Sequence, residues 1–89
     1  MSPRTYRIFF PSGQRFTLEG HFHLLGTTEM MPTIIAADRE RAWALDPRAV
    51  ILDDGRCIYD PRENPALPAI MRAWLAEHPE WPALTEAER

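Results

Sequence analysis

The feature that most constrains the fold is an Asp-Gly pair between two apolar runs. Residues 50–53 and 56–59 flank Asp54-Gly55, and this pattern is the strongest short-range signal for a β-hairpin. Asp60-Pro61 and Asn64-Pro65 then end the sheet, because proline cannot donate to a strand ladder. The apolar residues that follow at helical spacing are Leu67, Ile70, Met71, Trp74 and Leu75. The sequence therefore predicts a hairpin near 49–60 and a C-terminal helix near 67–77.

The Asp-Gly turn also predicts a strand register. A two-residue turn places Leu52 opposite Cys57 and Val50 opposite Tyr59. Both faces of the hairpin then carry apolar pairs, so we expect the hairpin to be central in its sheet. Cys57 is the single cysteine of the sequence, which excludes an intramolecular disulfide and a cysteine-based metal cluster. We expect its thiol to act as a small buried hydrophobe.

A second hairpin is predicted near 5–25. An aromatic run at 5–10 and turn residues at 11–14 precede a segment that alternates apolar and polar residues from Arg15 to Leu25. One face of that strand carries Phe16, Leu18, Phe22 and Leu24, and the other carries Arg15, Thr17, Glu19, His21 and His23. Such alternation indicates a strand with one solvated face. Gly20 within it indicates a bulge or a close approach of neighbouring backbone.

The fold class expected from these elements is α+β. It is an antiparallel sheet of about five strands with one C-terminal helix packed across a face. The segment 34–45 is ambiguous, because β-branched residues favour strands whereas Ala and Arg favour helix. We favour strands there, and the alternative is a second helix near 34–45. We expect a single compact domain over 1–84 and a frayed tail over 85–89.

Composition narrows the classes of function. All ten cationic side chains are Arg, lysine is absent, and the net charge is −3. A lysine nucleophile is therefore excluded, and an acidic chain is a poor generic nucleic-acid binder. No apolar run approaches the roughly 20 residues of a membrane span, and the first residues lack the apolar core of a secretion signal. We therefore expect a cytoplasmic protein that makes no use of a membrane.

The pair His21 and His23 is the candidate metal site. Residues at alternate strand positions share a face, with Cα atoms roughly 6.6 Å apart. One ion can bridge two such imidazoles when a third ligand is available, and Glu29 is the candidate carboxylate. Two histidines on a solvated strand face are more often plain polar surface. No cofactor is predicted other than this divalent metal.

Two other sets of residues are candidates for binding. Arg7 and Arg15 lie among the aromatic residues of the first hairpin and are the candidates for binding single-stranded nucleic acid. Trp81, which lies between Glu80 and Pro82, is the candidate interface anchor. The favoured alternative for Trp81 is that its ring folds back as a lid over the end of the helix.

No combination of residues indicates catalysis, so no catalytic residue is assigned and we lean towards a non-enzyme. The expected function is a small binding or regulatory domain that acts through a protein partner or by self-association, for example as a homodimer. Single-stranded nucleic-acid binding and metal binding are the two alternatives.

Overall fold

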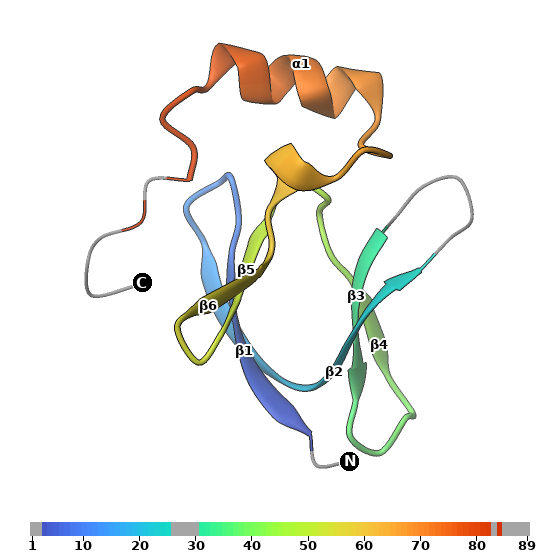
Figure 1. The fold of residues 1–89 in the computed structure, drawn as a ribbon. Helices are drawn as coiled ribbons and strands as arrows, with labels where there is room; N and C mark the ends of the chain where they lie inside the picture. The colour runs from blue at the N-terminus through green and yellow to red at the C-terminus, as the bar shows by residue number, and fades with distance from the viewer. Residues whose placement is uncertain (1–2, 26–30, 83, 85–89) are drawn as a thin grey trace.

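A single antiparallel sheet and one helix make up the computed structural model, which describes residues 3–25, 31–82 and 84 (Figure 1). The elements are β1 (Arg4–Phe9), β2 (Arg15–Leu25), β3 (Met31–Ala36), β4 (Ala42–Ala44), β5 (Val50–Asp53), β6 (Arg56–Tyr59), the 3-10 turn η1 (Pro61–Glu63) and α1 (Ala69–Glu77). The sheet has six strands in the order β4-β3-β2-β1-β5-β6. The α+β class is confirmed, with six strands in place of about five.

The ambiguous segment forms two strands joined by a turn. Residues 34–36 belong to β3, residues 42–44 form β4, and the turn between them is closed by a hydrogen bond of 2.9 Å from Ala36 N to Arg41 O. The alternative helix near 34–45 is therefore wrong. The β-branched residues decide the outcome, because Ile34 is fully buried at a position where β3 lies between β2 and β4.

The Asp-Gly hairpin forms, with a shift in register. Asp54 and Gly55 have φ angles of 51° and 82°, as the predicted turn requires, and Leu52 lies opposite Cys57. A bulge between Ile51 and Leu52 then brings Tyr59 opposite Ile51, so the expected pairing with Val50 is wrong. The shift turns the Tyr59 ring into the core beside Ile51.

The place of this hairpin in the sheet also differs from expectation. Strand β6 is an edge strand, so the hairpin is not central, and Cys57 on β6 is exposed instead of buried. Val50 and Leu52 are nevertheless only 2% and 3% exposed, because Trp81 and Leu84 cover that face together with Phe9. The hairpin thus has apolar residues on both faces because the C-terminal segment packs on one of them, and not because the hairpin lies between other strands.

The strand β2 bends and changes its partner at Gly20. Residues 15–20 pair with β1, residues 20–25 pair with β3, and Gly20 is paired with both Arg4 and Ala36. Figure 1 shows β2 curving between the two halves of the sheet. A Cβ atom at Gly20 would lie 2.2 Å from the carbonyl oxygen of Ile35. The close backbone approach expected at this glycine is confirmed.

The main core lies on the face of the sheet that this bend encloses. Its buried members are Tyr6, Ile8, Ile34, Leu45, Ala49, Ile51 and Tyr59. Alternate residues of β1 therefore point into it, whereas Phe9 belongs to the second cluster on the opposite face. Both faces of β5, and of β1 at Phe9, are thus covered.

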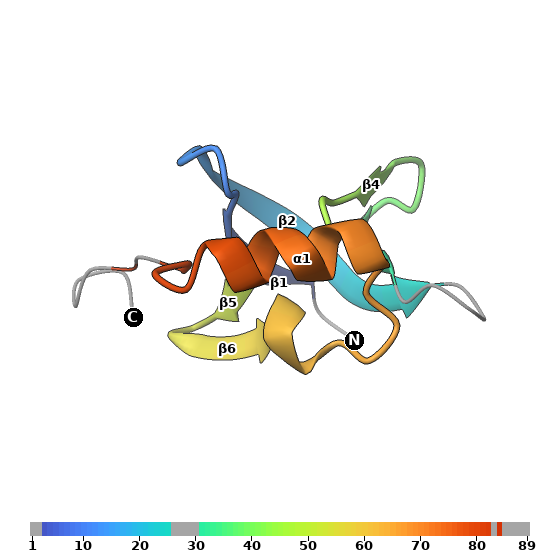
Figure 2. The ribbon, with the colours of Figure 1, turned by 90° about the horizontal axis from the view of Figure 1, so that it is seen from above.

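The helix α1 lies across one end of the sheet and not on a face, as Figures 1 and 2 show. It begins at Ala69, directly after Pro68, and Leu67 and Leu75 are each 3% exposed. Ile70 is 80% exposed, so its place in the expected apolar stripe is wrong. Around the helix Ile70 lies about 100° from Met71 and about 140° from Leu75, so it points away from the side that these two residues share. No helix in the described residues is long and apolar enough to span a membrane.

Arg62 fastens the chain that follows the helix. Its guanidinium donates hydrogen bonds to the carbonyl oxygens of Leu75, His78 and Trp81, the last two at 3.0 and 2.9 Å. The Trp81 indole N–H in turn donates to Arg48 O at 2.8 Å. The Leu75 and His78 carbonyls also accept backbone N–H groups, so the guanidinium adds a charged donor to them and bonds Trp81 O, and together these contacts hold Trp81 over the second cluster.

Replacing Gly20 should destabilise the fold at the bend of β2. We expect Gly20→Ala to lower the free energy of unfolding by about 2–3 kcal/mol, because the added methyl meets backbone that cannot rotate away. Chemical denaturation measures this, with the exposed β2 substitution Thr17→Ala as the control. Equal stability of the two variants would contradict a close approach at Gly20.

Removing the Arg62 guanidinium should loosen the C-terminal segment. We expect Arg62→Met to cost about 1–2 kcal/mol and to shift the tryptophan emission to longer wavelength, because three carbonyls lose a charged donor. Arg56→Met is the control, since Arg56 lies exposed on the edge strand β6. An unchanged emission spectrum would contradict the fastening role of Arg62.

Candidate functional site

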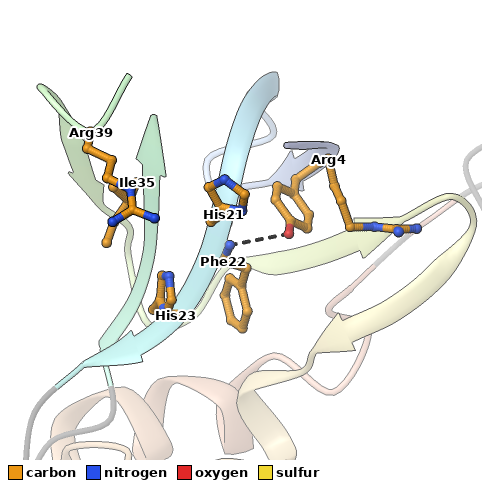
Figure 3. A pocket seen from close by; sticks show the side chains of 7 residues that line it. Arg4, His21, Phe22, His23, Ile35 and Arg39 are labelled. Carbon is orange, nitrogen blue, oxygen red and sulfur yellow. Dashed lines mark hydrogen bonds between the residues drawn. The ribbon is translucent and has the colours of Figure 1, made fainter. Parts of the chain in front are cut away.

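A pocket of about 740 Å³ opens where β2 leaves β1 (Figure 3). The pairing of β1 with β2 ends at Arg4 and Gly20, whereas β2 continues to Leu25 with β3 as its partner. The segment 21–25 therefore has one side without a neighbouring strand in the described part of the chain. The residues that line the pocket are Arg4, Tyr6, His21, Phe22, His23, Ile35 and Arg39.

The polar groups of the pocket come from three elements. His21 and His23 are at alternate positions of β2 and share a face. Arg39 belongs to the turn between β3 and β4, where it has a φ of 63° and donates its backbone N–H to Ala36 O. Figure 3 shows the Arg39 side chain reaching past Ile35 towards the two histidines. Arg4, at the start of β1, also lines the pocket, and Figure 3 shows its guanidinium turned away from the two histidines.

These polar groups differ in their partners. Arg4 Nε donates to Asp53 Oδ2 at 2.6 Å, and this hydrogen bond and charge raise the pKa of the Arg4 guanidinium above its ordinary value. The side chains of His21, His23 and Arg39 make no hydrogen bond or ion pair within residues 3–25, 31–82 and 84. Three nitrogen-bearing groups thus stand at one pocket with no protein partner in the described residues, one of them half-buried and two exposed.

A hydrogen bond from backbone to side chain shapes the inner wall of the pocket. Phe22 N–H donates to the Tyr6 hydroxyl at 3.2 Å, which supplies the acceptor that a neighbouring strand would otherwise give (Figure 3). The two rings lie with centroids 6.2 Å apart, and Tyr6 is only 5% exposed. The wall is therefore held by the core and does not depend on a ligand for its form.

The electrostatics of the pocket favour an anion. Arg4 and Arg39 are permanently charged, and no carboxylate is found in the pocket lining given by the described residues. A guanidinium fork matches the oxygens of a carboxylate or a phosphate in a bidentate manner. A metal ion at the same place would face the charge of Arg39, together with that of Arg4, which Asp53 partly offsets.

The proposed metal ligands are brought together only in part. His21 and His23 line the same pocket, as their spacing predicts, whereas Glu29 lies outside the described residues. Among the residues that are described, no group of three His, Cys, Asp or Glu side chains is placed to hold a metal ion. The metal site stays a prediction.

The proposed nucleic-acid residues meet elsewhere, on the opposite face of β1. The guanidinium carbons of Arg7 and Arg15 lie 5.3 and 5.5 Å from the centroid of the Phe9 ring. Phe9 is 2% exposed, so its ring has no face left for a base, and Arg15 also donates to Gly13 O. Phe16 is exposed but lies edge-on to Phe10. Nucleic-acid binding through Arg7 and Arg15 stays a prediction.

Trp81 folds back on the protein. Its ring lies against the cluster of Phe9, Val50 and Leu52 and makes an edge contact with Trp74 at 6.5 Å. It also lines a second pocket, of about 330 Å³, beside the C-terminal segment. The ring is half-buried, so part of it faces solvent. Its role as an interface anchor is untested and stays a prediction.

Sequence reasoning missed Arg4 and Arg39. Nothing close to either residue in the chain indicates a site, because Arg4 opens a strand and Arg39 stands in a turn of charged residues. What could have indicated Arg39 is the pairing of β2 with β3. It places His21 opposite Ile35 and so brings the turn between β3 and β4 near the histidines. The sequence indicates a close backbone approach at Gly20, but it does not reveal that β2 changes its partner there from β1 to β3.

Comparison with protein families, with curated proteins and with solved structures finds no match for this chain.

Metal analysis tests the choice between a cation and an anion. We expect purified protein to carry no near-stoichiometric zinc or iron, because Arg4 and Arg39 oppose a cation in the pocket. Plasma mass spectrometry of the wild type and His21→Ala measures the content. Stoichiometric metal that His21→Ala removes would support the metal site and contradict the anion interpretation.

Proposed function

We propose that this chain is a non-enzymatic binding domain that acts through a protein partner, and that the pocket beside β2 receives an acidic group of that partner. The observation that carries the proposal is the set of three side chains, His21, His23 and Arg39, that have no partner in the described residues and face one pocket without a lining carboxylate. His21 is half-buried, whereas His23 and Arg39 are exposed, so water can satisfy these groups in the free protein and an acidic group of a partner can take the place of that water.

The surroundings of the pocket favour a discrete acidic group over a nucleic-acid backbone. Asp38 and Glu40 flank Arg39 in the same turn, are exposed, and the whole chain carries a charge of −3. A nucleic acid gains its affinity by neutralising several phosphates at once. The neighbouring acids would repel the phosphates on either side of the one that enters the pocket.

The apolar wall favours a protein segment over a free small anion. Tyr6, Phe22 and Ile35 line the pocket together with the cationic groups. A segment of polypeptide presents an acidic side chain and apolar neighbours at fixed spacing, so it can use both parts of the lining. In the described residues no strand lies beside 21–25 on that side of β2, so its backbone groups there, other than the Phe22 N–H that donates to Tyr6, can bond an extended segment.

Affinity capture with matched baits tests the proposal. We expect a protein partner that survives nuclease treatment and is retained by the wild type. His21→Asn/Arg39→Gln should reduce its recovery about tenfold, which corresponds to about 1.4 kcal/mol of binding free energy. Arg41→Gln is the control, because Arg41 stands exposed in the same turn and does not line the pocket. Quantitative mass spectrometry measures the recovery, and circular dichroism checks that each bait is folded.

Two results would contradict this function. If all three baits recover the same proteins in equal amounts, the partner does not bind through the pocket. Captured material that is lost on nuclease treatment would support single-stranded nucleic-acid binding instead. Where the partner is a second copy of the chain, sedimentation of the purified protein should show a dimer that the double variant loses and Arg41→Gln keeps.

A further inference from the structure

We infer that the acidic residue of the partner belongs to an extended segment that pairs antiparallel with β2 over 22–24, and that this residue has an apolar neighbour on each side. The inference rests on the proposed function and specifies how the partner binds at the same site. Main-chain hydrogen bonds give affinity in this mode of binding, and alternate side chains give specificity. Its basis is the course of the pocket and the orientation and exposure of Leu24.

The pocket runs along the edge of β2 and is not confined to one of its faces. His21 and His23 line it from one face of the strand, whereas Phe22 lines it from the opposite face, which packs against the main core. Figure 3 shows His23 and Phe22 on opposite sides of the β2 ribbon. A pocket whose lining includes both faces of a strand must pass the edge of that strand. Since no strand of the described chain lies there, the pocket takes the place of a neighbouring strand.

The backbone groups of Leu24 point to this edge. Leu24 lies opposite Pro32 of β3, and the Pro32 carbonyl accepts the N–H of Leu45 at 2.9 Å on the β4 side of β3. In an antiparallel pair, opposite residues direct their backbone groups either towards each other or away from each other. Because Pro32 directs its carbonyl away from β2, Leu24 directs its N–H and C=O away from β3. The Phe22 N–H, two residues earlier, donates to Tyr6 on the same edge, which leaves the Phe22 carbonyl for a segment.

The side chain of Leu24 supplies an apolar contact for such a segment. It is 40% exposed and lies on the same face of β2 as Phe22. A segment beside β2 places one residue opposite Leu24 and another opposite Phe22, where apolar side chains pack best. The residue between these two lies opposite His23, on the face where His21 and Arg39 also stand. The lining thus favours an acidic residue between two apolar ones.

Charge opposes the pairing of two copies of this chain through the same edge. Two β2 strands that pair antiparallel about a two-fold axis present the same face on the same side. The histidines and Arg39 of both copies would then gather on one face, and the described residues add no carboxylate to the pocket lining there. Like charges placed opposite each other destabilise a strand pair. The occupant is therefore a segment of another protein, with an acidic side chain opposite His23.

Degenerate peptides test this inference on the full chain, with fluorescence anisotropy as the measure of binding. An alternating mixture has a glutamate between two apolar residues, and a displaced mixture has the same two apolar residues together after the glutamate. A neutral mixture replaces the glutamate of the alternating mixture by glutamine. We expect the alternating mixture to bind about tenfold more tightly than either of the others. Arg39→Gln should weaken the alternating mixture about tenfold, whereas Arg41→Gln should leave it unchanged.

Changes to the backbone show whether the peptide binds as a strand. In the antiparallel pair both apolar residues direct their N–H groups to β2, whereas the glutamate directs its N–H away. An N-methyl group on either apolar residue should weaken binding about tenfold, and one on the glutamate should leave it unchanged. On the protein, Leu24→Pro removes the N–H at the open edge and should weaken binding about tenfold, whereas Leu24→Val keeps it. Circular dichroism checks the fold, and the N-methyl peptides decide if Leu24→Pro does not fold.

The outcomes separate the inference from the proposed function. Equal binding of the alternating and displaced mixtures, or N-methyl effects that do not alternate, overturns the strand pairing, and a loss in Arg39→Gln then still supports the proposed function. Binding of the neutral mixture as tight as that of the alternating mixture contradicts the acidic group and the proposed function together. Binding of no mixture overturns the inference, and the capture experiment then decides the proposed function by itself. A dimer of the purified chain that Leu24→Pro dissociates overturns the assignment to another protein in favour of a second copy.

Discussion

The close approach between the backbone of β2 at Gly20 and the carbonyl of Ile35 is the constraint on which the rest of the structure depends. With 2.2 Å between that oxygen and the position of a Cβ atom, only glycine lets β2 leave β1 and continue along β3. The bend encloses the main core on one side. It also leaves residues 21–25 without a second partner in the described chain, and the pocket forms there. Core and candidate site thus have a common origin.

A small domain must also cover the second face of its central strands. Phe9, Val50 and Leu52 are buried on that face by Trp81 and Leu84, which return from the far end of the chain. Their position depends on polar contacts, since Arg62 donates to the Trp81 carbonyl and the Trp81 indole N–H donates to the Arg48 carbonyl. The C-terminal segment therefore covers this face of the sheet, as a second layer of secondary structure does in a larger domain. The arrangement leaves the pocket at β2 free of this segment in the part of the chain that is described.

Local patterns predicted the elements, and long-range contacts decided their arrangement. Asp54-Gly55 and the alternation of β2 are signals contained within a few residues, so both hairpins were predictable. The bulge at Ile51 and Leu52, the edge position of β6 and the exposure of Ile70 depend on what packs against each element, which no local pattern contains. For the site, strand period alone placed His21 and His23 together. Arg39 could not be predicted, because it joins the histidines only through the register of β2 with β3.

A titration of the isotope-labelled protein with inorganic phosphate, followed by the amide signals in nuclear magnetic resonance, tests the central claim most directly. If the bend at Gly20 creates an anion site, saturable shifts should concentrate at His21, Phe22, His23, Ile35 and Arg39. Sodium chloride at equal ionic strength should not reproduce them, since screening acts on all exposed charges alike. Shifts centred on Arg7 and Arg15, or no saturable shift at any residue, would contradict the account.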